Sequence, residues 1–222
     1  MRPESKKPFT QHNQKLKPHN TQTIRIHSGT LKGLRLQLPP KTFTRPTKSI
    51  LRESFFNTIA HQVVGCVFIE GFGGSGSMGI EALSRGAKEI VFYEINPQIA
   101  QILELNLNKA LARLDSIHNE NLTQKTQSAR IIQQSFFYSF EMLQNTQSQT
   151  LLYLDPPFFT RKGMQELEQQ CFEFIVALRN PHIFLIAFEH ISIINLPKNL
   201  GKYVKIRAKK FGKSTISYYT LM

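Results

Sequence analysis

A glycine-rich segment at residues 70–83, EGFGGSGSMGIEAL, has the composition of a turn that binds an adenosine-containing ligand. Gly74, Gly76 and Gly79 follow the G-x-G-x-x-G spacing typical of dinucleotide-binding turns, and Glu94 follows about 20 residues later. This spacing alone leaves the ligand open, because glycine-rich turns between a strand and a helix serve several cofactors and sometimes none.

The acidic residue Glu70, which ends the apolar run before the glycines, bears on the charge of the ligand. A carboxylate disfavours a pyrophosphate, which normally binds at a helix N-terminus directly after the strand. S-Adenosylmethionine fits better, because it carries an ammonium and a sulfonium and no phosphate. We expect the glycines to let the backbone approach its methionine part, and Glu94 to accept hydrogen bonds from both ribose hydroxyls. The expected cofactor residues in this part of the chain are Glu70, Gly71, Gly73, Gly74, Gly76 and Glu94.

A second motif, Asp155-Pro156-Pro157-Phe158, directly follows an apolar run. Two consecutive prolines cannot extend a central strand, and they leave carbonyl groups without a local donor. The exocyclic amine of a base is a poor nucleophile, because its lone pair is delocalised into the ring. We expect hydrogen bonds to the Asp155 carboxylate and the Pro156 carbonyl to favour attack, and Phe158 to stack on the base. Alone, the motif fits a rigid turn equally well; beside the glycine segment it favours methylation of an amine.

The charge of the chain indicates a polyanionic partner. Of 222 residues, 28 are Lys or Arg and 15 are Asp or Glu, a net charge of +13. The basic residues are concentrated in two blocks, residues 25–52 and 198–213, that contain no acidic residue. A single surface lysine needs no explanation, but two such blocks favour binding to nucleic acid.

The remaining composition argues against other classes of protein. Cys66 and Cys171 each lie in an apolar run, so we expect buried thiols rather than a disulfide framework. The seven histidines lack the spacing of a zinc site, so no metal is expected. No apolar run approaches the length of a membrane span, and the first residues lack an apolar signal segment. We therefore expect a cytoplasmic protein without a membrane partner.

The elements that must position these motifs alternate between strands and helices. We expect a disordered basic arm at 1–22, a β-hairpin and helix extension at 23–62, and a catalytic domain at 63–222. The expected strands are 66–70, 89–94, 129–134, 151–155 and 182–189 with a C-terminal hairpin at 202–222; the expected helices are 78–87, 97–111 and 164–180, with a polar loop at 113–128. This order predicts a doubly wound α/β sheet, whose ligands bind at the carboxyl ends of the strands. The glycine turn and the Asp155 turn should therefore meet.

In combination, these motifs resemble the RsmD family of bacterial 16S rRNA guanine-N2 methyltransferases. The resemblance covers about residues 23–222 and rests on RIHSGTLKGLRLQLP, RPTKSILRESFFNTI, EGFGGSGSMGIEALSRGA, Glu94, LDPPF and KKFGKSTISYY. It implies a Rossmann-like class I methyltransferase fold with a mostly parallel, seven-stranded sheet and an antiparallel edge hairpin. It also implies that a monomer methylates the N2 amine of one guanine in 16S rRNA within the assembling small subunit.

The resemblance and the first basic block together indicate which residues contact RNA. Arg45 and Thr47 would lie near the cofactor and the target base, and Lys32 and Arg35 of the hairpin would grip RNA. Arg52, in the same block, is expected to contribute to this surface.

Three positions depart from the pattern of the family. The family has Asp where this chain has Glu70, an aspartate where it has Ser49, and often an acidic or amide residue where it has Ser135. Ser135 and Asp155 are still expected beside the cofactor, and the departures predict weakened cofactor affinity.

Three alternatives remain open at this point. An adenine-N6 DNA methyltransferase would use the same turn on a similar amine, although so short a chain shows no separate target-recognition domain. A non-catalytic RNA-binding assembly factor would keep the fold without methyl transfer. An NAD(P) oxidoreductase ranks last, because it leaves the Pro-Pro turn and the basic blocks unexplained.

Overall fold

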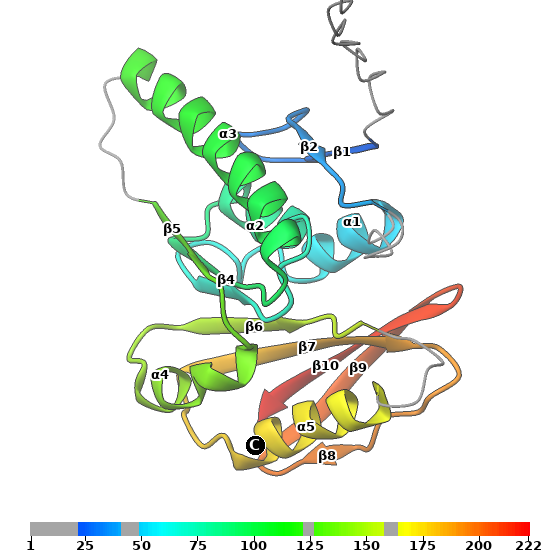
Figure 1. The fold of residues 1–222 in the computed structure, drawn as a ribbon. Helices are drawn as coiled ribbons and strands as arrows, with labels where there is room; N and C mark the ends of the chain where they lie inside the picture. Colours follow the sequence, from blue (N-terminus) through cyan, green and yellow to red (C-terminus); the bar gives the residue numbers. More distant parts are fainter. Residues whose placement is uncertain (1–21, 41–48, 122–126, 158–163) are drawn as a thin grey trace, which may run out of the picture.

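The computed structural model describes residues 22–40, 49–121, 127–157 and 164–222. Within these residues, eight strands form one sheet in the order β5-β4-β3-β6-β7-β10-β9-β8, and two further strands form a hairpin (Figure 1). The strands of the sheet are β3 (Val67–Glu70), β4 (Glu89–Tyr93), β5 (Ser128–Ile132), β6 (Thr150–Leu154), β7 (Ile183–Ile191), β8 (Asn199–Leu200), β9 (Tyr203–Phe211) and β10 (Ser214–Leu221).

The first five strands in chain order are parallel, and the last three are antiparallel. The predicted α/β sheet with an antiparallel edge hairpin is confirmed. The predicted number of seven strands is one too few, because the two-residue strand β8 pairs with β9 through Leu200 and Tyr203. So short a strand has no alternation of apolar and polar residues to reveal it.

Helices cover both faces of the sheet (Figure 1). On one side lie α1 (Ser49–Thr58), α2 (Ser77–Ser84) and α3 (Pro97–Asn121); on the other lie the 3₁₀ helix η1 (Phe136–Ser139), α4 (Phe140–Asn145) and α5 (Met164–Ala177). Alternate residues of the central strands belong to the two cores: Phe68 and Tyr153 pack with the first group of helices, Ile69 and Leu152 with the second. This two-residue alternation explains why the consecutive residues Val67–Ile69 and Leu151–Leu154 of these strands are all apolar.

Helix α3 is longer than the sequence pattern indicates. It was expected at 97–111 with a loop after it, but it continues to Asn121. Leu107, Ala110 and Leu114 are buried at spacings of three and four residues, so the apolar face continues beyond the predicted end. The polar residues that follow carry no proline or glycine to stop the helix.

The N-terminal hairpin pairs β1 (Thr23–Arg25) with β2 (Arg35–Gln37), as predicted from the alternation. It packs on the side of α1, α2 and α3, and its residues Ile24, Leu31 and Leu36 are buried in the same core as α2. The disordered arm predicted for 1–22 lies outside the described residues, apart from Gln22.

Candidate active site

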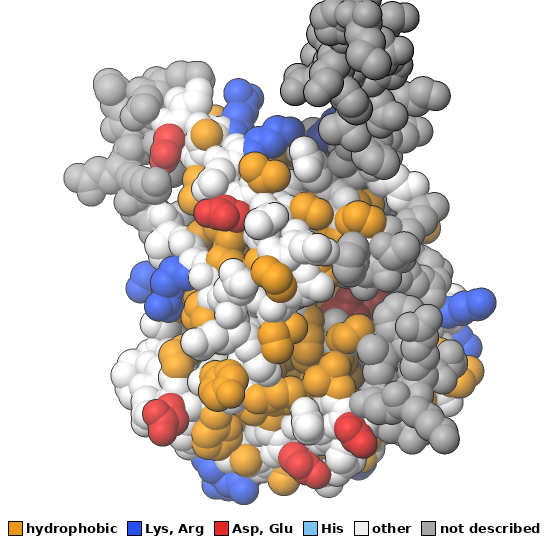
Figure 2. Space-filling model, in the orientation of Figure 1, with side chains coloured by type: hydrophobic (Ala, Val, Ile, Leu, Met, Phe, Trp, Pro, Cys, Tyr) orange, Lys and Arg blue, Asp and Glu red, His pale blue; other side chains and the backbone are white. Residues whose placement is uncertain are grey.

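A cavity of about 590 Å³ opens at the carboxyl ends of β3, β4, β6 and β7. Acidic side chains are recessed below an apolar rim on this face of the molecule (Figure 2). The cavity is lined by the loop after β3, the Asp155 turn after β6 and the hairpin turn between β9 and β10. The glycine turn and the Asp155 turn therefore meet, as the order of strands predicts.

The glycine loop combines one open position with two crowded ones. Gly74 has a left-handed backbone, φ 52°, and a Cβ there would contact nothing within 4 Å. In contrast, a Cβ on Gly71 would lie 2.5 Å from Leu154 Cδ2, and one on Gly73 would lie 2.9 Å from Leu103 Cδ2. The loop is therefore fixed on its protein side and leaves space above Gly74.

Gly76 was predicted to contact the cofactor, but it does not line the cavity. It precedes α2 with φ 74°, and a Cβ on it would lie 2.3 Å from Leu103 Cδ1. Gly79 lies within α2, where a Cβ would lie 2.4 Å from the ring of Phe92. The last two glycines of the G-x-G-x-x-G spacing thus allow the helix to pack closely on β4 and α3.

Glu94 follows β4 and lines the cavity with a side chain held from two sides. Its Oε2 accepts a hydrogen bond from the Gly74 N–H at 2.9 Å, and its Oε1 accepts one from the Asn96 N–H at 2.8 Å. Each oxygen of an ionised carboxylate can accept more than one hydrogen bond. Glu94 is thus a fixed acceptor beside the open Gly74 position, and its bond to ribose hydroxyls stays a prediction.

Glu70 ends β3 at the bottom of the cavity and is 5% exposed. Its Oε2 accepts a hydrogen bond from the Gly79 N–H at 2.8 Å. Burial raises the pKa of Glu70 to about 8; the Gly79 hydrogen bond opposes this rise and the charge of Glu94 adds to it. A cationic ligand in the cavity would favour the ionised form of Glu70.

The Asp155 turn brings a further carboxylate to the same wall. Asp155, Pro156 and Pro157 line the cavity, whereas Phe158 lies outside the described residues. Desolvation and the nearby charges of Glu189 and Glu70 raise the pKa of Asp155 well above its ordinary value.

Glu189 is a site residue that the sequence interpretation missed. It lies on β7, lines the cavity, and is 5% exposed. Its Oε2 accepts a hydrogen bond from the Tyr153 hydroxyl at 2.7 Å. The available signal was a carboxylate within the otherwise apolar run HIFLIAFE. Burying an acidic side chain in a central strand is unfavourable unless it is paired, hydrogen-bonded or functional.

The two serine departures occupy different places. Ser135 lines the cavity, and its hydroxyl caps η1 by accepting a hydrogen bond from the Phe137 N–H at 3.4 Å. Ser49 begins α1 and is exposed. The remaining cavity wall comes partly from residues outside the glycine segment and the Asp155 turn, including Leu38, Pro39, Lys213 and Ser214.

The predicted RNA-contacting residues divide into three groups. Lys32 and Arg35 are exposed on the hairpin, where they are free to face a ligand. Arg45 and Thr47 lie outside the described residues. The prediction for Arg52 is wrong: its side chain is fully buried, so it cannot reach a phosphate in solvent.

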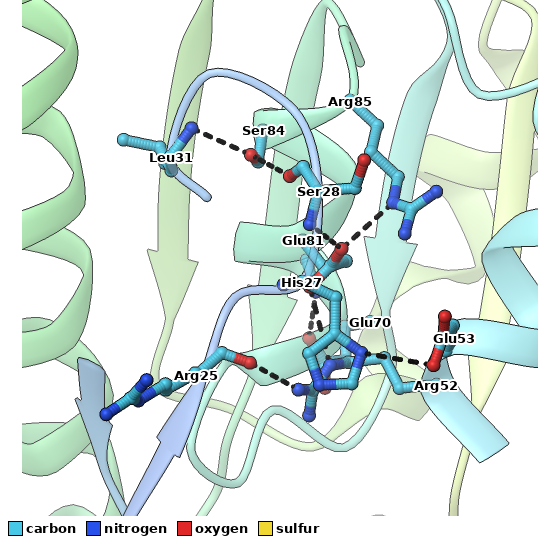
Figure 3. A network of polar contacts seen from close by, with 11 residues as sticks. Arg25, His27, Ser28, Leu31, Arg52, Glu53, Glu70, Glu81, Ser84 and Arg85 are labelled. Carbon is cyan, nitrogen blue, oxygen red and sulfur yellow. Dashed lines mark hydrogen bonds and ion pairs between the residues drawn. The ribbon is translucent and has the colours of Figure 1, made fainter. Parts of the chain in front are cut away.

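Arg52 instead joins the hairpin to α1 and α2 (Figure 3). Its Nη2 donates a hydrogen bond to the Arg25 carbonyl at 2.5 Å, and its Nε lies 3.5 Å from Glu81 Oε2. The Glu81 carboxylate also accepts hydrogen bonds from the backbone N–H groups of His27 and Ser28, at 2.8 and 3.1 Å. Arg52, which its place in a basic block predicts to be a surface charge, thus forms a structural ion pair with Glu81.

Two further side chains attach the hairpin. Ser84 Oγ donates to the Ser28 carbonyl and accepts from the Leu31 N–H (Figure 3). Asn106 of α3 bonds both backbone groups of Gln37 and donates to the Ser75 carbonyl at 2.8 Å. The end of the hairpin is therefore bonded to the same side chain as the glycine loop.

The described residues also bear on the other sequence expectations. Both cysteines are free and buried, as expected, and burial raises the pKa of each thiol to about 12. Among the described residues, no group of three or more His, Cys, Asp and Glu could hold a metal ion. In the same residues, no helix has the length and apolar character needed to cross a membrane.

Comparison with known proteins matches most of the chain. A family model described as "Conserved hypothetical protein 95" matches residues 24–220. Ribosomal RNA small subunit methyltransferase D of Haemophilus influenzae is 30% identical over 154 residues, 69% of this chain and 74% of the relative. YlbH of Bacillus subtilis is 29% identical over 203 residues, 88% of this chain and 98% of the relative. An Escherichia coli structure described as "Putative methyltransferase yhhF" has a TM-score of 0.67 at 26% identity, covering 90% of this chain and 98% of that chain.

The fold and its cavity, with these similarities, define a Rossmann-like class I methyltransferase that uses S-adenosylmethionine. Within that class the chain belongs to the RsmD family, as the family model and the relatives show. The residues present fit the cofactor: space lies above Gly74 where a side chain would otherwise stand, and Glu94 and Glu70 supply carboxylates for hydroxyl and cationic groups.

Proposed function

We propose that this protein methylates the N2 amine of a guanine in 16S rRNA of the assembling small ribosomal subunit. The observation that carries the proposal is the meeting of two motifs in one cavity. Glu70, Glu94 and the glycine loop line it together with Asp155 and Pro156. The name of the Haemophilus influenzae relative supports the choice of small-subunit rRNA as the substrate.

The cofactor, when bound, supplies an electrophilic methyl group. Glu94 would bind the ribose, and Glu70, Gly71, Gly73 and Gly74 would hold the methionine part. The Pro156 carbonyl and the Asp155 carboxylate accept hydrogen bonds from the two N–H groups of the target amine. These bonds orient the nitrogen lone pair toward the methyl group, and Asp155 takes the proton that the amine loses.

The surface around the hairpin suits a polyanion. Lys32 and Arg35 are exposed there, and the segment that continues from β2 supplies Leu38 and Pro39 to the cavity wall. RNA held on the hairpin would therefore lie close to the entrance of the cavity. We also propose that the protein acts as a monomer, that Arg45 and Thr47 lie near the cofactor and the target base, and that Phe158 stacks on the base.

An adenine-N6 methyltransferase remains the second candidate, because the Asp155 turn would bind either amine. A non-catalytic assembly factor is the third. It would retain RNA binding, and it would transfer no methyl group even with cofactor bound.

The experiment that separates these candidates uses the full-length protein and methyl-labelled S-adenosylmethionine. Small subunits from cells without this protein and duplex DNA are offered in parallel, and labelled nucleosides are identified by mass spectrometry. Label in N2-methylguanosine from the subunits supports the proposal. Label in N6-methyl-2′-deoxyadenosine from the DNA supports the second candidate, and no label despite measured cofactor binding supports the third.

A further inference from the structure

Glu189 lies directly across from Asp155 on the neighbouring strand. In the parallel pair of β6 and β7, Leu154 is in register with Phe188, so the next residues, Asp155 and Glu189, are also neighbours. Both line the cavity, and the charge of Glu189 acts on Asp155. Two carboxylates therefore line the same part of the cavity from adjacent strands.

This wall of the cavity offers acceptors for hydrogen bonds. Pro156 has no N–H and contributes only its carbonyl. A carboxylate that a cationic ligand in the cavity keeps ionised can only accept. The Tyr153 hydroxyl bonds Glu189 Oε2 at 2.7 Å, and this bond fixes the orientation of the carboxylate. A ligand edge with adjacent N–H donors can form hydrogen bonds with these acceptors, whereas an acceptor on the ligand edge is repelled by them.

Guanine is the base with such an edge, because N1–H and the N2 amine stand side by side. Adenine presents its N6 amine next to N1, which is an acceptor. We propose that Glu189 determines specificity for guanine by accepting the N1–H while Asp155 and Pro156 accept from the N2 amine. This inference rests on the proposed guanine-N2 methylation, and it assigns the selection of guanine over adenine at that site to Glu189.

The geometry gives the discrimination a physical reason. A buried carboxylate opposite an unprotonated ring nitrogen leaves two acceptors without a donor between them, which is unfavourable because neither acceptor regains the hydrogen bond that it makes in water. The Asp155 turn alone lacks this selectivity, because it bonds any exocyclic amine. Glu189 would thus separate a guanine enzyme from an adenine enzyme that shares the Asp155 turn.

The test is a double-mutant cycle between Glu189 and the N1–H of the target. Once the labelled nucleotide is mapped, small subunits are reconstituted with guanine or with 2-aminopurine at that position. 2-Aminopurine keeps the amine at C2 but has an unprotonated N1. Wild type, Glu189→Gln and the exposed control Glu173→Gln are compared by kcat/KM, with cofactor Kd and melting temperature measured alongside.

For wild type and Glu173→Gln we expect kcat/KM to fall at least about tenfold from guanine to 2-aminopurine. For Glu189→Gln we expect the guanine rate to fall at least about tenfold and the two substrates to differ by less than about threefold, since the amide can donate to N1. Cofactor Kd should stay within about twofold. Equal losses on both substrates, or no loss on guanine, would overturn the role of Glu189. If wild type makes no N2-methylguanosine on the guanine subunits, the proposed function itself fails.

Discussion

Two groups of charged residues adjoin helix α2: Glu81 with its arginines, and the carboxylates of the cavity. They differ in what stands opposite the carboxylates. Glu81 contacts the guanidinium groups of Arg52 and Arg85 and two backbone N–H groups of the hairpin. In the cavity, the charges of Glu189 and Glu70 act on Asp155, and the charge of Glu94 acts on Glu70. The first group is neutralised within the protein; the second is neutralised only in part.

This difference separates structure from function. A carboxylate whose partners are all internal stabilises the docking of the hairpin. Carboxylates whose pKa is raised by burial and by nearby acidic charges in a cavity are suited to bind a cation and to accept protons. Arg52 acts on both groups. It contacts Glu81, and its charge also lowers the pKa of Glu70. The hairpin extension is therefore part of the electrostatics of the cofactor cavity.

The largest expected effect comes from the cavity group. Asp155→Asn removes the carboxylate that holds the target amine and takes its proton, so the methylation rate should fall by about 10²–10⁴-fold. The melting temperature should not fall, because burial disfavours the ionised form of Asp155. Initial rates on small subunits and thermal unfolding check this. A rate within threefold of wild type would contradict the assignment.

The next effect comes from the paired group. Arg52→Met removes one of the two guanidinium partners of the buried Glu81 carboxylate. The loss should lower the free energy of unfolding by about 3–5 kcal/mol. Denaturant titration measures the change. Arg85→Ala is the matched control, because Arg85 contacts the same carboxylate from a partly exposed position. This substitution should lower the free energy of unfolding by about 1 kcal/mol. Equal effects of the two variants would break the comparison.

A smaller effect concerns the pH dependence of stability. The folded-state pKa of Glu70, about 8, lies above its ordinary value, so the folded protein holds a proton that the unfolded chain releases. Stability from this group falls as pH rises from about 4.5 to 8. Glu70→Gln should remove that fall and raise the melting temperature of the cofactor-free protein by about 3 °C at pH 8.5, with little change at pH 5. A larger gain at pH 5 than at pH 8.5 would contradict this sign.

The smallest effect concerns the exposed basic residues. Replacing Lys32 and Arg35 together with alanine should reduce the slope of log affinity against log salt for RNA by about 1.5. Cofactor Kd should be unchanged. Lys88→Ala, another exposed lysine, serves as the control. A slope unchanged by the double variant would remove the hairpin from the RNA-binding surface.

Much of the fold could be predicted, because apolar runs bounded by glycine and proline mark the central strands. The run before Glu70 and the run before Asp155 both proved to be parallel strands beside each other. The end of α3 and the short strand β8 were not predicted. Both depend on tertiary packing, namely the burial of Leu114 and the pairing of Leu200 with Tyr203.

The site was predictable where chemistry coincided with a motif. Glu70, Gly74, Glu94 and Asp155 were predicted because turns at strand ends stand out in the sequence, and all four line the cavity. Glu189 was missed because it lies inside a strand, and only strand order brings it beside Asp155. Arg52 was misassigned because a basic residue in a basic block gives no sign that a helix face buries it against Glu81.

The most direct test of the central claim is a crystal structure with S-adenosylhomocysteine. The account predicts ribose hydroxyls within hydrogen-bonding distance of Glu94 and the methionine part above Gly74. It also predicts the sulfur facing the side of the cavity that Asp155 and Glu189 line. A ligand bound elsewhere, or bound here with the sulfur turned away from Asp155, would contradict the claim that the two motifs form one methyl-transfer site.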